Sequence, residues 1–553
     1  MCRRDGWISL NGAWDFALDA DARWSQPGEV AWAGPIEVPF SPETPRSGVA
    51  ATGYFQACWY RRSVRPPPLG PDERLLLHFG AVDHLATVWV DGAQVATHEG
   101  GYTPFTVDLT PLLRGQPLEV VVRAADDPHD LAKPRGKQDW LREPHSIWYP
   151  RTSGIWQTVW LERVPPVSIA KLCWASNLMR WEIDASVILQ GRFRPGLSLR
   201  LRLSVGDLLL ADDLCQLTHP ELYRRIALSD PGIDDARNAL LWSPETPTLI
   251  DARIELRDAD GRVIDAVDSY TAIRTIGIEG DRIILNGRPI KLRMVLDQGY
   301  WPDTGLSAPD DEALRRDVEL AKAMGFNGVR KHQKVEDPRY MYWADRLGLM
   351  VWGEMPSAYR FTQVSVERLT REWMAVIRRD ESHPCIIAWV PFNESWGVPN
   401  LPDNPSERHY VQALYHLTKT LDPTLLDARY QSPEIQQNLK TQRFGGRILV
   451  IQGHRCDHPL ILSEFGGVKL SDEEGTWGYA RSATPRQLER RLRALFEVVR
   501  QQELFAGYCY TQFADTYQEA NGLLHADRTP KFPLERIAAL NGVGPREPSH
   551  EGS

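Results

Sequence analysis

The chain has 553 residues, of which 42% are hydrophobic and 25% are charged, and these are the proportions of a folded globular protein. Its length corresponds to roughly three or four domains. The net charge of −9 provides no basic surface for a nucleic acid. No apolar run approaches the roughly 20 residues that cross a bilayer. We therefore expect neither a nucleic-acid partner nor a membrane.

The seven cysteines are odd in number and scattered along the chain, which is typical of reduced thiols. Residues 1–7 lack the apolar stretch of a secretory signal. Both features predict a cytoplasmic location. The 20 tryptophans stand out, because flat apolar rings with a polar group pack protein cores and also stack on sugar rings.

Before residue 275 the sequence consists of short alternating strands separated by turn residues. Strands are predicted over residues 74–79, 86–90, 93–97, 118–123, 157–162, 199–203, 208–210 and 251–256. Asp91-Gly92 supplies the left-handed turn of a hairpin, and Pro165-Pro166 marks a boundary between two β domains. Many closely spaced strands with no helix between them indicate β-sandwiches.

After residue 275 strands and helices alternate. Strands are predicted over residues 289–295, 325–330, 349–354, 385–390, 448–451, 460–462 and 507–510, and helices over residues 311–324, 338–347, 366–379, 407–421 and 485–501. No glycine-rich nucleotide loop follows the first strand. The alternation therefore favours a (β/α)8 TIM-type barrel over an open nucleotide-binding sheet.

Two glutamates follow apolar runs of this predicted barrel, where its active site is expected. Glu394 comes after the strand 385–390, and Glu464 comes after the strand 460–462. Either residue alone could cap a helix, but a pair at the mouth of a barrel suits glycoside cleavage. One carboxyl group, kept protonated by an apolar setting, donates to the leaving oxygen, while the other attacks the anomeric carbon.

The motifs around both glutamates resemble those of a known enzyme family. Asn393-Glu394-Ser-Trp396 and Ser463-Glu464-Phe-Gly-Gly467 resemble the acid/base and nucleophile signatures of glycoside hydrolase family 2, which includes β-galactosidases, β-glucuronidases and β-mannosidases. Other segments resemble further parts of that family: 9–16, 88–92 and 154–162 its sugar-binding jelly roll, and 285–290 the approach to its barrel. The resemblance implies a jelly roll over 1–165, an immunoglobulin-like sandwich over 166–275 and a catalytic barrel over 276–553.

The resemblance also implies roles for single residues. Glu394 would be the acid/base and Glu464 the nucleophile of a retaining reaction, and Asn393 would bind the sugar 2-hydroxyl. Arg330 matches a family arginine whose charge would keep the nucleophile ionised; a structural ion pair is an equal alternative. Further substrate-binding candidates are Asp297, Trp396, Tyr510 and His332.

Other polar and aromatic residues near strand ends are as compatible with core packing or capping as with ligand contact: Gln298, Trp301, Trp352, Glu354, Gln333, Gln512, Asp515 and Asn521. The run His454-Arg-Cys-Asp-His458 has no matching second pair of ligands, so we assign no metal site. No organic cofactor is expected, because two carboxylates supply the chemistry; a divalent cation is left open.

The sequence departs from the family in two places. Only 70 positions separate Glu394 from Glu464, and 448–451 is the one apolar run where two strands are expected, because 425–430 reads as helical. The barrel could therefore lack one strand, and a carbohydrate-binding protein with impaired catalysis is the alternative function.

The second departure concerns the sugar. Leu523 follows Asn521 where family glucuronidases carry the lysine of an Asn-x-Lys motif, which counts against glucuronides and favours β-galactosides. β-Glucuronidase, β-mannosidase and α-L-arabinosidase activities stay as alternatives. The partner is expected to be a carbohydrate substrate, and the sequence is compatible with a monomer or a homo-oligomer.

Overall fold

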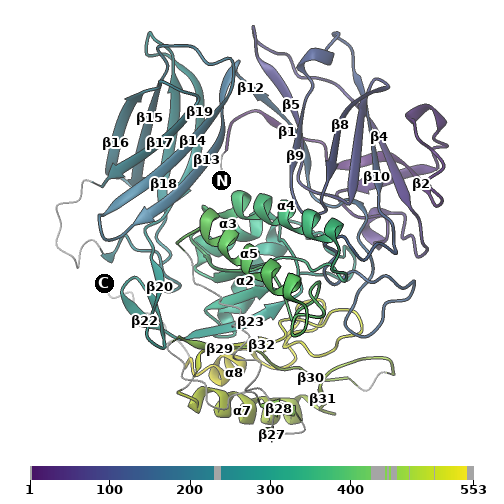
Figure 1. Cartoon of the computed structure of the whole chain (residues 1–553), viewed down its shortest axis with the longest axis vertical. Helices are drawn as coiled ribbons and strands as arrows, with labels where there is room; N and C mark the ends of the chain where they lie inside the picture. The colour runs from purple at the N-terminus through teal and green to yellow at the C-terminus, as the bar shows by residue number, and fades with distance from the viewer. Residues whose placement is uncertain are drawn as a thin grey trace.

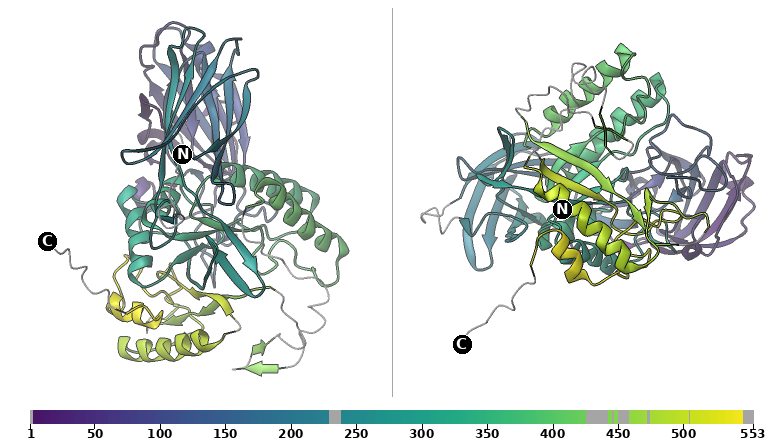
Figure 2. Two further views of the ribbon diagram at one scale, coloured as in Figure 1. Left: turned by 90° about the vertical axis from the view of Figure 1, so that its left-hand side faces the viewer. Right: turned by 90° about the horizontal axis from the view of Figure 1, so that it is seen from below.

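The computed structural model describes residues 3–228, 238–424, 442–444, 447–449, 458–471, 474–503 and 505–544. Two β-sheet parts lie side by side, and an α/β part lies beneath both of them (Figure 1). The views in Figure 2 show the same arrangement from the side and from below. Among the described residues, no helix is long and apolar enough to cross a membrane.

The N-terminal part contains a six-stranded sheet in the order β3-β2-β4-β10-β7-β8 and a four-stranded sheet in the order β1-β12-β5-β9, with β6 and β11 as a separate pair. The strands are β1 (Trp7–Ser9), β2 (Gly12–Asp19), β3 (Gly34–Val38), β4 (Ala57–Val64), β5 (Arg74–Phe79), β6 (Val82–Asp83), β7 (Leu85–Val90), β8 (Ala93–Glu99), β9 (Phe105–Asp108), β10 (Leu118–Ala125), β11 (Gly154–Ile155) and β12 (Val159–Val164). Three short 3-10 helices join them: η1 (Pro27–Glu29), η2 (Pro45–Ser47) and η3 (Thr110–Leu112).

Both faces of the six-stranded sheet are buried at its centre. Val120 and Val122 of β10 point into the core between the sheets, whereas Val121 packs on the opposite face with Trp59 and Trp89. The two tryptophan rings stack with centroids 5.3 Å apart. Much of the tryptophan content is therefore core packing, because large flat rings fill space between a sheet and its cover.

The second β part consists of two antiparallel sheets, β13-β14-β17 and β16-β15-β18-β19. Its strands are β13 (Val167–Asn177), β14 (Glu182–Gly191), β15 (Ser198–Val205), β16 (Leu208–Gln216), β17 (Glu221–Ala227), β18 (Ile250–Arg257) and β19 (Val263–Thr271). In β15 the buried Leu199, Leu201 and Leu203 alternate with Arg200 and Arg202. This period of two buries one face of the strand and leaves the other to solvent.

The α/β part begins with a small sheet and continues into six parallel strands in the order β26-β25-β24-β23-β32-β29. Its strands are β20 (Ile276–Glu279), β21 (Arg282–Leu285), β22 (Arg288–Ile290), β23 (Leu292–Asp297), β24 (Gly328–Lys331), β25 (Met350–Glu354), β26 (Ile386–Val390), β29 (Leu460–Gly466), β30 (Val468–Lys469), β31 (Ala480–Arg481) and β32 (Phe505–Thr511). Its helices are α2 (Asp311–Ala323), α3 (Pro338–Leu347), α4 (Gln363–Asp380), α5 (Pro405–Leu421), α7 (Pro485–Gln501) and α8 (Leu534–Leu540).

Local signals explain where these elements lie. Strand β26 is buried along its whole length, as expected for a parallel strand that is covered on both faces. Helices α2, α4 and α7 are capped at their N-termini by Asp310, Thr362 and Thr484, whose side chains accept hydrogen bonds from backbone N–H groups of the first turn.

The strand predicted at 448–451 is present in its described residues, but its expected place in the barrel is wrong. Arg447–Leu449 forms β28, which pairs antiparallel with β27 (Gln442–Phe444) in a separate two-stranded ribbon and not with the parallel sheet. An apolar run identifies a strand but not its partner, and that is the reason for the error. In the described part of the chain, β26 and β29 are the two edges of the parallel sheet. The helical prediction for 425–430 lies outside the described residues.

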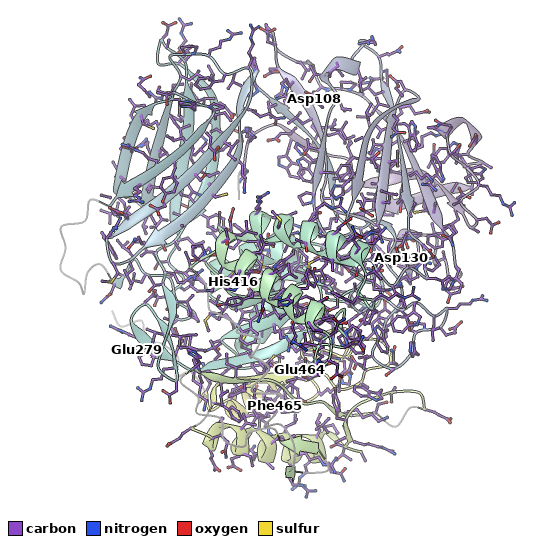
Figure 3. All side chains as sticks on the ribbon, in the orientation of Figure 1. Asp108, Asp130, Glu279, His416, Glu464 and Phe465 are labelled. Carbon is purple, nitrogen blue, oxygen red and sulfur yellow. The ribbon has the colours of Figure 1, made fainter. Side chains whose placement is uncertain are left out.

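A buried glutamate lies where the jelly-roll part meets α4. Glu372 accepts a 2.7 Å hydrogen bond from the Tyr102 backbone N–H. It is almost fully buried, and this burial raises the pKa of Glu372 to about 8. Neighbouring Arg368 pairs with Asp130 and Glu99 of the jelly-roll part, and Figure 3 shows Asp130 beside the helix. This contact is therefore where we expect pH to affect the stability of the protein.

We predict that the Glu372→Gln variant is less sensitive to alkaline pH than the wild type. In the folded protein the pKa of Glu372 is raised above its ordinary value of 4.5. The wild type therefore has its full stability below about pH 4.5 and loses stability as the pH rises through about 8. The upper limit of this loss is about 4 kcal/mol at pH 8. Urea unfolding at pH 5 and pH 8.5 measures it, and Glu367→Gln on the exposed face of α4 is the control. Equal pH dependence of all three proteins would contradict the prediction.

Candidate active site

One arginine joins the ends of three barrel strands. Arg330 of β24 is buried, and its Nε donates to Glu354 Oε2 of β25 at 2.7 Å. Its Nη2 donates to Asn393 Oδ1 beyond β26 at 2.5 Å. Its Nη1 donates at 3.0 Å to both the Ser463 carbonyl and Glu464 Oε1 of β29. A single guanidinium therefore brings Glu464 to the residue that precedes Glu394.

The position of Glu464 results from a β-bulge. The register between β29 and β32 shifts between Leu462 and Phe465, so that one extra residue of β29 is accommodated. Such bulges re-aim side chains next to active sites. The Glu464 side chain is about one quarter exposed (24%) and so reaches solvent as well as Arg330. Figure 3 labels Glu464 beside Phe465 at the barrel.

Steric constraints explain the first glycine of the Ser-Glu-Phe-Gly-Gly motif. Gly466 has a φ of +97°, and a Cβ there would collide with the Tyr510 ring. The ring of Tyr510 is fully buried beneath this strand and packs on Phe465 and Phe496. Tyr510, expected to bind substrate, thus packs against the strand that carries Glu464.

Glu394 lies beyond the end of β26 on a turn of left-handed backbone, with φ values of +48° at Glu394 and +66° at Ser395. Its side chain is exposed, whereas Asn393 is buried. The sequence predicted an apolar setting for this glutamate. The difference arises because the residue belongs to the turn after the strand and not to the buried strand itself.

Glu354, a weak candidate from sequence, is central in the structure. Its Oε1 lies 3.1 Å from His332 Nδ1 and accepts a 2.9 Å bond from the Gln333 backbone N–H. Although burial opposes ionisation, the Arg330 charge and His332 lower the pKa of Glu354 to about 2. The Arg330 pKa is raised in turn by Glu354 and Glu464. The site therefore has a fixed ion pair beneath Glu464.

The remaining candidates have different surroundings. Asp297 is buried, accepts from the Gly299 N–H and pairs with Lys331, so its oxygens are occupied. Trp396 lies against Trp148 and Tyr359, with ring centroids 5.8 Å and 5.2 Å apart. These rings place a partly exposed aromatic group beside Glu394.

A loop of the jelly-roll part reaches the barrel mouth, and sequence reasoning missed it. The backbone N–H groups of Arg135 and Gly136 donate to the Ser357 carbonyl at 3.1 Å, and Tyr359 Oη donates to the Gly136 carbonyl at 2.7 Å. Gly136 is so close that a Cβ there would lie 2.5 Å from the Gln333 carbonyl oxygen. The next residue, Lys137, is buried and experiences the charges of Glu519, Glu464, Glu394 and Glu354.

No sequence signal marked Lys137 or Glu519, because neither belongs to a motif with catalytic spacing. Asn521, which the sequence analysis considered instead, accepts a 2.8 Å bond from Gln512 Nε2. Leu523 is fully buried in the hydrophobic core. Glu519 accepts from Tyr149 Oη and experiences the charges of Lys137, His332 and Glu464.

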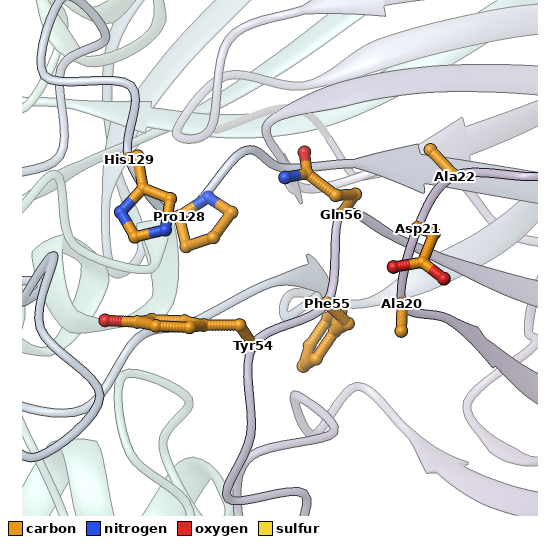
Figure 4. A pocket seen from close by; sticks show the side chains of 8 residues that line it. All are labelled: Ala20, Asp21, Ala22, Tyr54, Phe55, Gln56, Pro128 and His129. Carbon is orange, nitrogen blue, oxygen red and sulfur yellow. The ribbon is translucent and has the colours of Figure 1, made fainter.

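Figure 4 shows a pocket elsewhere, in the jelly-roll part, lined by Ala20, Asp21, Ala22, Tyr54, Phe55, Gln56, Pro128 and His129. Asp21 is its one carboxylate, so it lacks the pair of acids that glycoside cleavage needs. Within the described ranges, no group of three His, Cys, Asp or Glu residues is arranged to hold a metal ion. Residues 454–457 of the histidine cluster lie outside those ranges.

Comparison with known proteins matches this architecture. The model for the TIM barrel domain of glycosyl hydrolases family 2 matches residues 276–443. The family's galactose-binding domain-like model matches residues 47–166, and a further model of glycosyl hydrolases family 2 matches residues 220–274. These models describe a class of glycoside hydrolases with β-sheet domains before a catalytic barrel. The chain belongs to glycosyl hydrolase family 2, and the predicted family and fold class are confirmed.

Relatives within the family carry different names. A β-galactosidase of Thermoanaerobacter pseudethanolicus is 26% identical over 352 residues, which are 62% of this chain and 45% of that protein. A β-glucuronidase of Streptococcus agalactiae is 24% identical over 85% of this chain and 84% of its own length. The chain thus spans less than half of the first relative and most of the second.

The structure of a β-glucuronidase from Ruminococcus gnavus in complex with D-glucuronic acid superposes with a TM-score of 0.76, at 20% identity, over 98% of each chain. At this identity the likeness establishes the fold.

We predict that Arg330→Met destabilises the protein by about 3 to 5 kcal/mol, because it leaves Glu354 as an uncompensated buried charge. The double variant Arg330→Met/Glu354→Gln should recover part of that loss. Denaturant unfolding at pH 7 measures both, with Arg315→Met, in an exposed ion pair of α2, as a control that changes stability by less than about 1 kcal/mol. Additive effects of the two substitutions would refute the coupling.

Proposed function

We propose that this protein is a retaining, exo-acting β-glycosidase that hydrolyses an O-glycosidic bond of a carbohydrate. Its catalytic centre would lie in a barrel over residues 276–553, after a jelly roll over 1–165 and an immunoglobulin-like sandwich over 166–275. The observation that carries the proposal is the Arg330 guanidinium, which contacts both Glu464 and the neighbour of Glu394. Two carboxylates from different strands then face one substrate.

In the first step Glu464 attacks the anomeric carbon, and Glu394 donates its proton to the glycosidic oxygen as the bond to the aglycone breaks. In the second step Glu394 accepts a proton from water, whose oxygen attacks the same carbon and releases Glu464. This double displacement requires carboxyl groups about 5 to 5.5 Å apart. Arg330 serves it by orienting the Glu464 carboxyl group, to whose Oε1 its Nη1 donates at 3.0 Å.

Asn393 is proposed to bind the sugar 2-hydroxyl. Its Oδ1 already accepts from Arg330 Nη2, so its orientation is fixed and its amide N–H group is the donor that remains for the substrate. A hydrogen bond at this hydroxyl strengthens in the transition state and lowers the barrier. The partly exposed Trp396 would offer an aromatic face to the aglycone.

For the sugar we propose a neutral β-glycoside, with a β-galactoside as the first candidate. The relatives include both β-galactosidases and β-glucuronidases, and the segment 519–523 contains no lysine. β-Glucuronides, β-mannosides and α-L-arabinosides are the competing substrates. A cytoplasmic location remains part of the proposal.

The test is hydrolysis of p-nitrophenyl β-D-galactoside, β-D-glucuronide, β-D-mannoside and α-L-arabinoside by the purified chain. We predict that Glu394→Gln and Glu464→Gln each reduce turnover of the preferred substrate by more than about 100-fold, whereas Glu497→Gln, on the exposed face of α7, leaves it unchanged.

Experiments with azide and with a substrate that has a good leaving group distinguish the nucleophile, Glu464, from the acid/base, Glu394. Glu464→Gly should form the α-glycosyl azide, because azide replaces the nucleophile, and Glu394→Gly should form the β-glycosyl azide. Glu394→Gln should also keep most of its glycosylation rate on a dinitrophenyl glycoside, whose departure needs no proton. Saturable sugar binding without turnover by a folded wild type would instead support a carbohydrate-binding function.

A further inference from the structure

A buried lysine of the jelly-roll part, Lys137, lies at the barrel mouth and has no role in the mechanism proposed above. Lys137 is only 6% exposed. In the part of the chain that the structure describes, its ammonium has neither a hydrogen bond nor an ion pair. A buried ammonium without an acceptor is costly, and burial lowers the pKa of Lys137 even though four glutamates oppose that shift. This site therefore favours a ligand that supplies an acceptor.

The backbone around Lys137 is rigid, so its position is not accidental. The guanidinium of Arg135, itself fully buried, donates to the carbonyls of Gln138 at 2.9 Å and Pro128 at 3.1 Å and folds the loop around itself. Gly136 lies against the barrel loop at Gln333, as described above. Lys137 is thereby held at the carboxyl ends of the parallel strands, where the substrate is proposed to bind.

Tyr149 links Lys137 to Glu519. Its backbone N–H donates to the Lys137 carbonyl at 2.8 Å, and its hydroxyl donates to Glu519 Oε2. Gln518 Nε2 ties the same barrel loop to the jelly-roll loop by donating to the Trp148 carbonyl at 2.7 Å. Glu519 is the carboxylate with the largest effect on the charge of Lys137, yet the two groups form no ion pair with each other.

We propose that Lys137 and Glu519 bind the same hydroxyl group of the sugar: the ammonium donates to the hydroxyl oxygen, and the hydroxyl donates to the carboxylate. In this arrangement the hydroxyl oxygen would lie about 2.8 Å from each group. The inference rests on the proposed glycosidase function and adds the recognition of the substrate to it. It also makes the jelly-roll part a component of the active site.

The same geometry argues for a neutral sugar. The charges that act on Lys137 are those of four carboxyl groups, Glu354, Glu394, Glu464 and Glu519, and two of these, Glu354 and Glu464, also pair with Arg330. A uronic acid would add a further carboxylate close to Glu354, Glu464 and Glu519, and like charges at close range disfavour binding. A hydroxyl group, in contrast, satisfies the cation and the carboxylate together.

The experiment uses the full chain and the glycoside that the wild type hydrolyses fastest, together with its 3-, 4- and 6-deoxy derivatives. Lys137→Met and Glu519→Gln should each reduce kcat/KM on the parent glycoside by about 10- to 100-fold. On one deoxy derivative, for which the wild type itself is slow, neither variant should cause a further loss. Arg142→Met, an exposed cation of the same loop, is the matched control and should behave as the wild type. Thermal melting verifies that each variant is folded.

The other possible results contradict the shared hydroxyl, the neutral sugar or the proposed function, as follows. Unchanged kcat/KM in both variants, or an equal loss on every derivative, would refute the shared hydroxyl. A wild type that prefers the β-glucuronide to the matching β-glucoside, with that preference lost in Lys137→Met, would mean that the lysine binds a carboxylate and the neutral-sugar inference is wrong. If Lys137→Met fails to fold, Glu519→Gln, which keeps the side-chain shape, decides. Absence of turnover of any glycoside by the wild type would instead refute the proposed function.

Discussion

The Arg330 guanidinium lies among the ends of β24, β25, β26 and β29 and donates to Glu354, Asn393, Glu464 and the Ser463 carbonyl. A buried guanidinium is tolerated only where acceptors surround it, since removing it from water without partners is expensive. The positions of these strand ends are therefore coupled to one another. The geometry of the candidate active site depends on this ion-pair network more than on the individual strands.

The docking of the jelly-roll part is a second constraint. Its loop around Arg135 contacts the barrel at Ser357 and Tyr359, and Glu372 of α4 accepts from its Tyr102 N–H. Because loops can carry function only where a rigid scaffold positions them, these contacts give the buried Lys137 a defined place at the barrel mouth. In the proposed reaction the N-terminal part would thus contribute to the site as well as to the architecture.

Much of the fold could be predicted from the sequence, because hydrophobic periodicity and helix caps are local signals. The strand 350–354 and the helix 338–347 lie within a residue of their predicted limits. The strand at 448–451 was expected in the barrel and instead pairs with the neighbouring residues 442–444, because an apolar run does not specify its partner strand. The packing of the Tyr510 ring beneath Gly466 could not be predicted either, since a residue near a strand end can point inward or outward.

By itself the sequence determined the family, the order of the β and α/β parts, and the two motifs that carry Glu394 and Glu464, because each of these is written in contiguous residues. Only the tertiary structure decided that Arg330 joins both motifs, that Glu354 completes the ion pair, and that Tyr149 links the backbone of Lys137 to Glu519. These contacts join residues up to several hundred positions apart. They exist because folding brings strand ends and a distant loop to the same edge of the barrel, a result that no local pattern specifies.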